Sequence, residues 1–324
     1  MADWLVEDGI GEQRAILIAS GAVVAAKVAW TGELLAGAVV AAKLVSRNTG
    51  SSRGTARLAD GTELLVDRLP RDASEGATLT FEVTRAAIGE GSRRKLAQAR
   101  PSERRPGPLP TLADVIAATG DTVQNIHRFT GGEWDHLWAE IAEGRIDFAG
   151  GSMLFSPTPA MTLIDIDGTL PPPALAIATV RPLAAALTRF DIGGSVGIDF
   201  PTLQTKADRR AVDEALEDAL TGYPHERTAM NGFGFVQIVS RSTGPSLLHR
   251  FAADPAGCAA RLLLRSAEAV AGAGAILLTC QPAVATALQA PWLDALARRT
   301  GREIRVRTDP ALAQQAGFAQ SVPI

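Results

Sequence analysis

Two acid-ended segments, Met161-Thr-Leu-Ile-Asp-Ile-Asp167 and Gly193-Gly-Ser-Val-Gly-Ile-Asp-Phe200, indicate the fold at the centre of this chain. Each is an apolar run of strand length that places a carboxylate where a buried strand gives way to a surface loop. Because side chains alternate between the two faces of a strand, Asp165 and Asp167 share one face. Asp199 joins them if the two strands pair.

Carboxylates gathered in this way indicate a metal site. They repel one another, and a hard cation such as Mg2+ or Mn2+ relieves the repulsion while leaving open positions for water and phosphate oxygens. The pattern therefore predicts metal-assisted phosphodiester hydrolysis. A plainer interpretation stays open, because an aspartate at a strand end is also a common turn former or helix N-cap, and Asp167-Gly168 is itself a turn dipeptide.

A third segment, Asn231-Gly-Phe-Gly-Phe-Val-Gln-Ile-Val-Ser-Arg-Ser-Thr-Gly-Pro-Ser-Leu247, follows the first two. Read in this order, the three segments resemble the catalytic core of the ribonuclease E/G family, whose members are single-strand endoribonucleases. The resemblance is clearest over residues 149–247. It is weaker over the N-terminal hundred residues and the C-terminal seventy, and faint between 101 and 148.

The resemblance implies a role for each aspartate. Asp165 and Asp199 correspond to the two metal-binding aspartates, and both are then catalytic. Asp167 is the third catalytic candidate: it takes the place of an asparagine that helps to orient the scissile phosphate or the attacking water, and it would orient water or metal. The extra negative charge of Asp167 would attract the metal but repel the phosphate, so activity is either retained with an altered metal preference or lost.

The resemblance also implies a multidomain α+β fold. Residues 1–33 form a hairpin that packs on a ribonuclease-H-like subdomain, and residues 34–100 form an S1 domain, an OB-type β-barrel that binds RNA. Residues 101–148 are a basic, Pro-rich linker and the helical remnant of the sensor and ribonuclease-H-like region. Residues 149–250 form a DNase-I-like catalytic domain, and residues 251–324 a small C-terminal α/β domain.

Composition agrees with an intracellular enzyme. The 324 residues are 46% hydrophobic and 21% charged, enough for a sizeable core in two or more domains. Neither a basic-then-apolar leader nor an apolar run near the ~20 residues that span a bilayer is present, so we expect a cytoplasmic protein without a membrane partner. Cys258 and Cys280 are the only cysteines. The family's zinc-sharing Cys-x-x-Cys is missing, so we expect no zinc, and any homodimer must form without a zinc link.

The net charge of −3 offers no general attraction to nucleic acid, so an RNA site must depend on local positive charge. The clearest patch is Arg93, Arg94, Lys95, Arg100, Arg104 and Arg105. It is either a phosphate track or a solvated linker that prolines interrupt. Lys206, Arg210 and Arg241 are further candidate phosphate contacts, with a solvated surface face as the alternative.

Aromatic residues are scarce in the expected barrel, where Phe81 is the only one between Thr31 and Arg105. We therefore expect weak base stacking there and a larger share for charge. Residues 10–30 are typical of a hairpin. Farther along, apolar spacing predicts helices from Thr111 and from Glu133, with Trp134, Trp138 and Ile141 on one buried face. Near the C-terminal end, Pro282–Arg299 is expected to form a single helix. The family's 5′-monophosphate sensor has too few residues to form here, and Gly232 replaces a further sensor arginine, so we expect little or no dependence on the 5′ end.

The sequence thus predicts a metal-dependent endoribonuclease of reduced size, which hydrolyses single-stranded RNA in RNA processing or decay and leaves a 5′-phosphate and a 3′-hydroxyl. The main alternative is an RNA-binding protein of the same fold that has weakened or lost catalysis. A third is a structural partner in an RNA-processing or ribosomal assembly.

Overall fold

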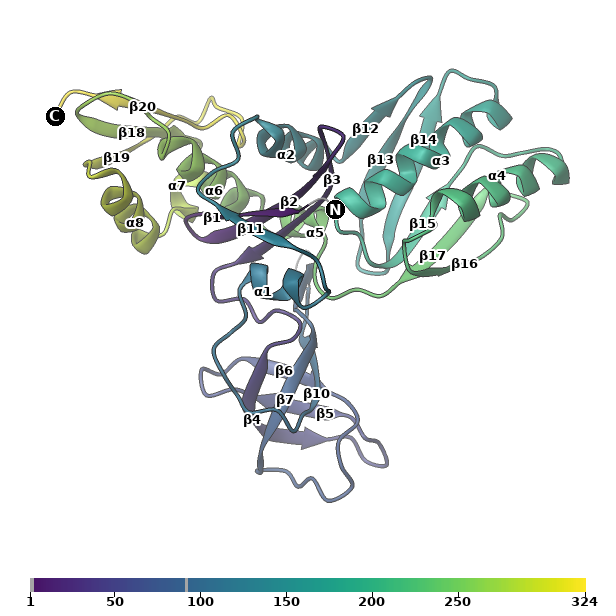
Figure 1. Cartoon of the computed structure of the whole chain (residues 1–324), viewed down its shortest axis with the longest axis horizontal. Coiled ribbons are helices and arrows are strands. Elements are labelled where there is room, and N and C mark those ends of the chain that lie inside the picture. Colours follow the sequence, from purple (N-terminus) through teal and green to yellow (C-terminus); the bar gives the residue numbers. More distant parts are fainter. Residues whose placement is uncertain (1–2, 91–92) are drawn as a thin grey trace.

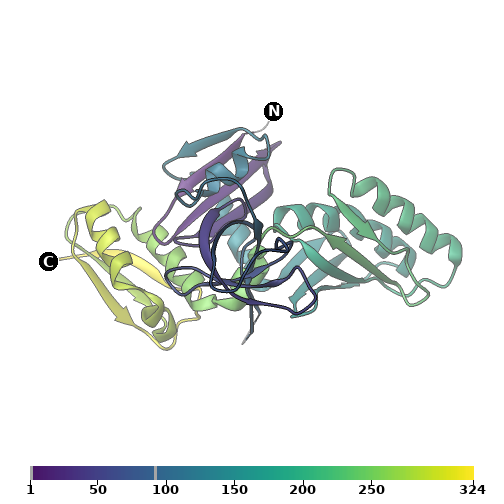
Figure 2. The ribbon, with the colours of Figure 1, turned by 90° about the horizontal axis from the view of Figure 1, so that it is seen from below.

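A computed structural model describes residues 3–90 and 93–324, with only the backbone given for Glu90 and Arg93. Figures 1 and 2 show three arms that meet at the N-terminal strands: a small barrel, a six-stranded sheet with its helices, and a C-terminal sheet with its helices. The chain is therefore a mixed α+β protein with several separate sheets.

The N-terminal strands form a four-stranded sheet in the order β11-β1-β2-β3. Its strands and the two nearby helices are β1 (Trp4–Asp8), β2 (Glu12–Ala19), β3 (Ala22–Trp30), β11 (Val123–Ile126), α1 (Leu112–Ala117) and α2 (Glu133–Glu143). The β2–β3 hairpin confirms the hairpin predicted for residues 10–30. Its turn residues Ser20 and Gly21 both have positive φ, as the tight turns that match strand twist require. Trp134, Trp138 and Ile141 are buried, as their spacing predicted.

Five strands close into a barrel in the order β10-β6-β5-β4-β7. They are β4 (Val39–Arg47), β5 (Gly54–Arg57), β6 (Glu63–Val66), β7 (Thr78–Arg85) and β10 (Ala97–Pro101). Leu44, Leu64 and Phe81 fill the interior, so the barrel has its own core. This closed five-stranded form fits the expected OB-like barrel. A short hairpin, β8 (Ile88–Glu90) and β9 (Arg93–Lys95), leaves the barrel and packs on a helix of the core, α5 (Leu247–Ala253).

The six-stranded sheet has the order β12-β13-β14-β15-β17-β16. Its elements are β12 (Arg145–Phe148), β13 (Gly151–Pro157), β14 (Thr162–Gly168), β15 (Gly194–Asp199), β16 (His225–Arg227), β17 (Phe235–Ser240), α3 (Pro172–Arg189) and α4 (Lys206–Ala219). β14 and β15 are parallel, and α3 connects them. α3 and α4 cover one face, where Ile164, Ile198 and Val212 lie in a single apolar core. The other face is left open.

The C-terminal arm holds a three-stranded sheet in the order β19-β18-β20. Its elements are α6 (Pro255–Ala267), β18 (Ala275–Cys280), α7 (Pro282–Ala287), α8 (Ala290–Thr300), β19 (Ile304–Thr308) and β20 (Phe318–Val322). The helix that the sequence predicts from Pro282 to Arg299 is instead two helices. The backbone of Leu288 is extended, and Pro291 has no N–H with which to continue a helix across this point.

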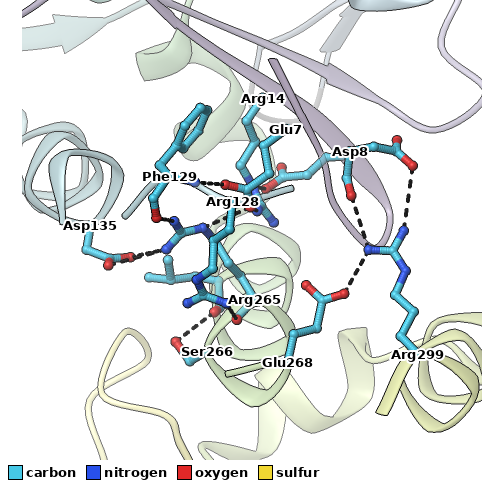
Figure 3. Close-up of polar contacts among 12 residues, drawn as sticks. Glu7, Asp8, Arg14, Arg128, Phe129, Asp135, Arg265, Ser266, Glu268 and Arg299 are labelled. Atoms are coloured by element: carbon cyan, nitrogen blue, oxygen red, sulfur yellow. Dashed lines mark hydrogen bonds and ion pairs between the residues drawn. The ribbon is translucent and has the colours of Figure 1, made fainter. Parts of the chain in front are cut away.

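A buried ion network joins the N-terminal strands and α2 to the C-terminal arm (Figure 3). Arg14 of β2 donates from Nη1 to Glu7 at 2.5 Å and from Nε to Glu12 at 2.6 Å. Arg265 of α6 donates to the same Glu7 carboxylate at 3.1 Å, to Asp135 at 3.0 Å and to the Phe129 carbonyl at 3.2 Å. Burial alone would lower the pKa of Arg14, but the Glu12 and Glu7 carboxylates outweigh it and the pKa is raised. The network fixes β1, the segment before α2, and α6 against one another.

Candidate acidic site on the open sheet face

Asp165 and Asp199 lie side by side in the six-stranded sheet. The parallel register of β14 and β15 pairs these two residues directly, and it ends there. Ile164 and Ile166 point into the core while Asp165, Asp167 and Asp199 are exposed, so the side-chain alternation predicted for these strands is confirmed. Two carboxylates from segments 34 residues apart in the chain therefore share one patch of the open face.

Asp167 occupies a different position. It lies two residues after Asp165 on the same face of β14, opposite Ser152 of β13. The pairing with β15 has already ended before this point. In the part of the chain that the structure describes, no group of three or more histidine, cysteine, aspartate or glutamate side chains could hold a metal ion. The structure thus brings together two of the three predicted carboxylates and leaves the third farther along the strand.

The surroundings of the acidic pair are largely apolar. Leu154 of β13 is the cross-strand neighbour of Asp165, and Leu163 precedes Asp165 by one pleat on the same strand. Phe235 of β17 is the cross-strand neighbour of Asp199. Leu154 and Leu163 are exposed, although they lie in regular strands. These apolar positions were not predicted as site residues, but the period-two pattern of each strand assigns them to the face of the aspartates.

The predicted basic contacts are dispersed. Lys206 is exposed at the start of α4, and Arg210 is exposed but forms an ion pair with Glu214 at 2.9 Å. Arg241 is exposed just beyond Ser240, which pairs with Gly194 at the opposite end of β15 from Asp199. The structure therefore separates Arg241 from the acidic pair.

The predicted basic patch is divided between two places. Arg100 and Arg104 are ion-paired with Glu82 at 3.1 and 3.3 Å and Arg105 is exposed beyond β10, whereas Arg94 and Lys95 lie in the β8–β9 hairpin. Lys95 donates to the Pro159 carbonyl at 3.1 Å, so the hairpin reaches the β13–β14 turn of the six-stranded sheet. Arg94 is exposed. The side chain of Arg93 lies outside the described residues.

Arg94 also lines a cavity of about 780 Å³ between the barrel, the β3–β4 connection, and α5 and α6. Arg250 lines the same cavity, but its guanidinium is paired with Glu33 at 2.8 and 3.1 Å. Arg261 lies over the rings of Trp30 and Trp292 at 4.5 and 4.6 Å. Because the guanidinium groups of Arg250 and Arg261 already contact carboxylate and aromatic partners, we interpret the cavity as part of the junction between the arms.

The remaining findings concern membrane-spanning helices and the two cysteines. Over residues 3–90 and 93–324, no helix has the length and apolarity needed to cross a bilayer. Cys258 and Cys280 are buried free thiols.

Comparison with known proteins identifies partial relatives. No protein-family model matches the chain. Ribonuclease G of Salmonella typhimurium (strain SL1344) and ribonuclease G of Escherichia coli (strain K12) are each 26% identical to it over 198 residues, an alignment that covers 52% of this chain. The aligned part spans 40% of each of those ribonucleases. The chain is therefore distantly related to the ribonuclease E/G family.

Proposed function

We propose that this chain is a metal-dependent endoribonuclease that hydrolyses phosphodiester bonds in single-stranded RNA and leaves a 5′-phosphate and a 3′-hydroxyl. The observation that carries the proposal is the direct pairing of Asp165 and Asp199 on an open face. The distant relationship to ribonuclease G supports the choice of RNA. We place the activity in RNA processing or decay in the cytoplasm.

The donor set at the acidic pair fits a hard divalent cation. Magnesium is commonly held by one or two carboxylates together with water and substrate phosphates, so a third protein carboxylate is not required. Asp165 and Asp199 would hold Mg2+, or Mn2+ in its place. A bound cation would supply an acidified water and would offset the charge of a phosphodiester. We propose no role for zinc, because Cys258 and Cys280 do not form a Cys-x-x-Cys pair.

The chain's own residues would position the substrate. The open face leaves room for an extended strand, because α3 and α4 lie on the opposite face. Lys95 contacts the β13–β14 turn, Arg94 lies in the same hairpin, and Lys206 lies at the start of the helix that follows Asp199. We assign the nearest phosphate contact to Lys206, with Arg93, Arg94, Lys95, Arg210 and Arg241 as more distant contacts along the strand. A homodimer, where one forms, has no zinc link.

Cleavage of a labelled, A/U-rich single-stranded RNA tests the proposal. Wild type is assayed with Mg2+, with Mn2+ and with EDTA, beside Asp165→Asn, Asp199→Asn and Asp147→Asn. Asp147 is the matched control, because it lies on the same open face but its carboxylate is paired with Arg145 at 2.8 Å. We expect metal-dependent cutting that both site substitutions abolish and the control retains. Product 5′-phosphates are checked with an exonuclease that requires them.

The second candidate is an RNA-binding protein of the same fold without catalysis. The position of Asp167 favours it, because this residue adds negative charge near the pair without joining a three-carboxylate group. RNA binding by wild type without cutting in either metal would select this function. Tight binding of one structured RNA without cutting would instead indicate a structural partner in an assembly.

A further inference from the structure

The apolar residues around the acidic pair form one connected surface. A Cβ atom placed on Gly197, which lies one pleat before Asp199, would be 2.6 Å from Cζ of Phe235, 2.8 Å from Sδ of Met161 and 3.0 Å from Cδ2 of Leu163. The three side chains therefore converge over the backbone of Gly197. The absence of a side chain at Gly197 lets the Phe235 ring, whose residue is the cross-strand neighbour of Asp199, extend over Gly197.

Phe233 is a second phenylalanine near this surface in the chain, and it is 83% exposed. It lies in the turn that leads into β17, two residues before Phe235. Single exposed apolar residues are common on proteins, but a phenylalanine exposed to this degree forgoes most of the stabilisation that burial of a large apolar side chain contributes.

The turn holds Phe233 in place. Oδ1 of Asn231 accepts hydrogen bonds from the backbone N–H of Phe233 at 2.9 Å and of Phe235 at 3.1 Å. The Gly234 carbonyl accepts from the N–H of Phe200, the residue that follows Asp199, at 3.2 Å. The exposed ring is thus carried by a backbone that is fixed to the strand of the acidic pair.

We infer that Phe233 and Phe235 form a base-binding subsite, on which unpaired nucleobases stack while the adjoining phosphate lies at Asp165 and Asp199. The inference rests on the proposed function and adds to it the side chains that hold the bases. Stacking on aromatic rings is the usual sequence-tolerant contact to single strands. Phe81, the one aromatic residue of strands β4 to β10, is fully buried, so the barrel strands offer no exposed ring for this purpose.

A nucleotide suits this surface better than a second protein does. An apolar protein partner would have to desolvate the two carboxylates beside the rings, which is costly without a matching cation. A nucleotide instead brings an apolar base and an anionic phosphate together, and a cation at the acidic pair accommodates the phosphate. Phe235 and Leu163 would contact one base edge-on or face-on, and Phe233 the next one along the strand.

Binding of two ten-nucleotide probes tests the subsite. One is fluorescent oligouridylate and the other a ribose-phosphate oligomer of equal length without bases, both measured with Ca2+ after a gel confirms that they stay intact. We expect wild type to prefer oligouridylate. Phe233→Ala should weaken its binding about 5- to 150-fold, the effect of losing one stacked base, and leave the abasic probe unchanged. Phe233→Trp should retain the binding.

Two substitutions serve as controls. Val239→Ala removes an apolar side chain, 46% exposed, from the same face at a greater distance from Asp199, and Phe318→Ala removes an exposed phenylalanine from the C-terminal sheet. Both should bind as wild type does. Because the ring of Phe233 is exposed, Phe233→Ala should unfold at the wild-type temperature, which separates loss of binding from loss of fold.

Several results would overturn the inference. One is that Phe233→Ala binds oligouridylate with wild-type affinity, and another is that wild type binds both probes equally well. A third is that Phe233→Ala changes self-association while RNA binding stays intact, which would assign the rings to a protein interface. The nuclease proposal fails separately. Base-dependent binding through Phe233 without cleavage in any metal keeps the subsite and rejects the nuclease, whereas cleavage that Phe233→Ala leaves unchanged rejects the subsite alone.

Discussion

Asp167 is the residue at which charge is expected to limit RNA binding. It is exposed on the face of Asp165 and lies outside the directly paired carboxylates. We expect Asp167→Asn to raise the affinity for single-stranded RNA, measured with Ca2+ at low salt, by about two- to fivefold. That corresponds to about 0.5–1 kcal/mol, the scale of one unit charge a few ångströms away in water. The gain should shrink as salt is raised.

Asp147→Asn is the matched control at this scale. Asp147 and Asp167 both have Ser152 as a neighbour, on opposite sides, but the Asp147 carboxylate is paired with Arg145. Its removal should change RNA affinity less than that of Asp167. Weaker binding by Asp167→Asn would mean that this carboxylate helps to retain the cation instead of repelling phosphate.

The two thiols give a prediction about burial. Cys258 and Cys280 are both buried, and burial raises the pKa of each. A raised pKa lowers the thiolate fraction at a given pH, and only the thiolate reacts quickly. We expect no reaction with a thiol reagent at pH 8 in the native protein and reaction of both thiols after unfolding. Rapid modification of one thiol in the native state would show that the C-terminal arm opens locally.

At the scale of elements, the β8–β9 hairpin is the part of the barrel arm that reaches the six-stranded sheet. Because Phe81, the aromatic residue of the barrel, is buried, RNA binding by the barrel arm should depend on charged side chains. We expect Arg94→Ala to weaken RNA binding and to reduce the slope of log Kd against log salt by about 0.7, the value for one phosphate contact with a single strand. Arg100→Ala should change the slope less, because Arg100 is paired with Glu82 at 3.1 Å. Equal slopes for both variants would contradict a phosphate contact at Arg94.

Elements with local signals could be predicted from the sequence. The alternation in Ile164-Asp165-Ile166-Asp167 assigns each side chain to a face, and the three- and four-residue spacing in α2 assigns Trp134 and Trp138 to the core. β20 carries no such signal, since Phe318–Val322 mixes polar and apolar residues in a mostly exposed strand. The division of the C-terminal helix at Leu288 depends on a backbone conformation that the apolar spacing does not report.

At the scale of the whole molecule, the contacts that join the arms were beyond prediction. Glu7 and Arg265 are 258 residues apart, and nothing in either neighbourhood marks the other as a partner. Asp165 and Asp199 could be paired in advance only because each ends a strand of the same sheet. Phe233 could be predicted only in part. Its position follows from β17, but its exposure depends on which residues pack nearby.

Arg265 therefore offers the sharpest test of how the arms are held together (Figure 3). We expect Arg265→Met to lower the free energy of unfolding by about 3 kcal/mol in urea titrations. This is the lower end of the range for breaking a buried pair, because Glu7 keeps Arg14 as a partner. Hydrogen exchange should rise in α6 and in residues 129–135, which lose their shared contacts. Arg299→Met is the control: Arg299 also bridges the N-terminal strands to α6, through Asp8 and Glu268, but its side chain is 39% exposed against 2% for Arg265. An exposed bridge contributes at most about 1 kcal/mol, so equal losses in the two variants would show that the buried network is not what fixes the arms.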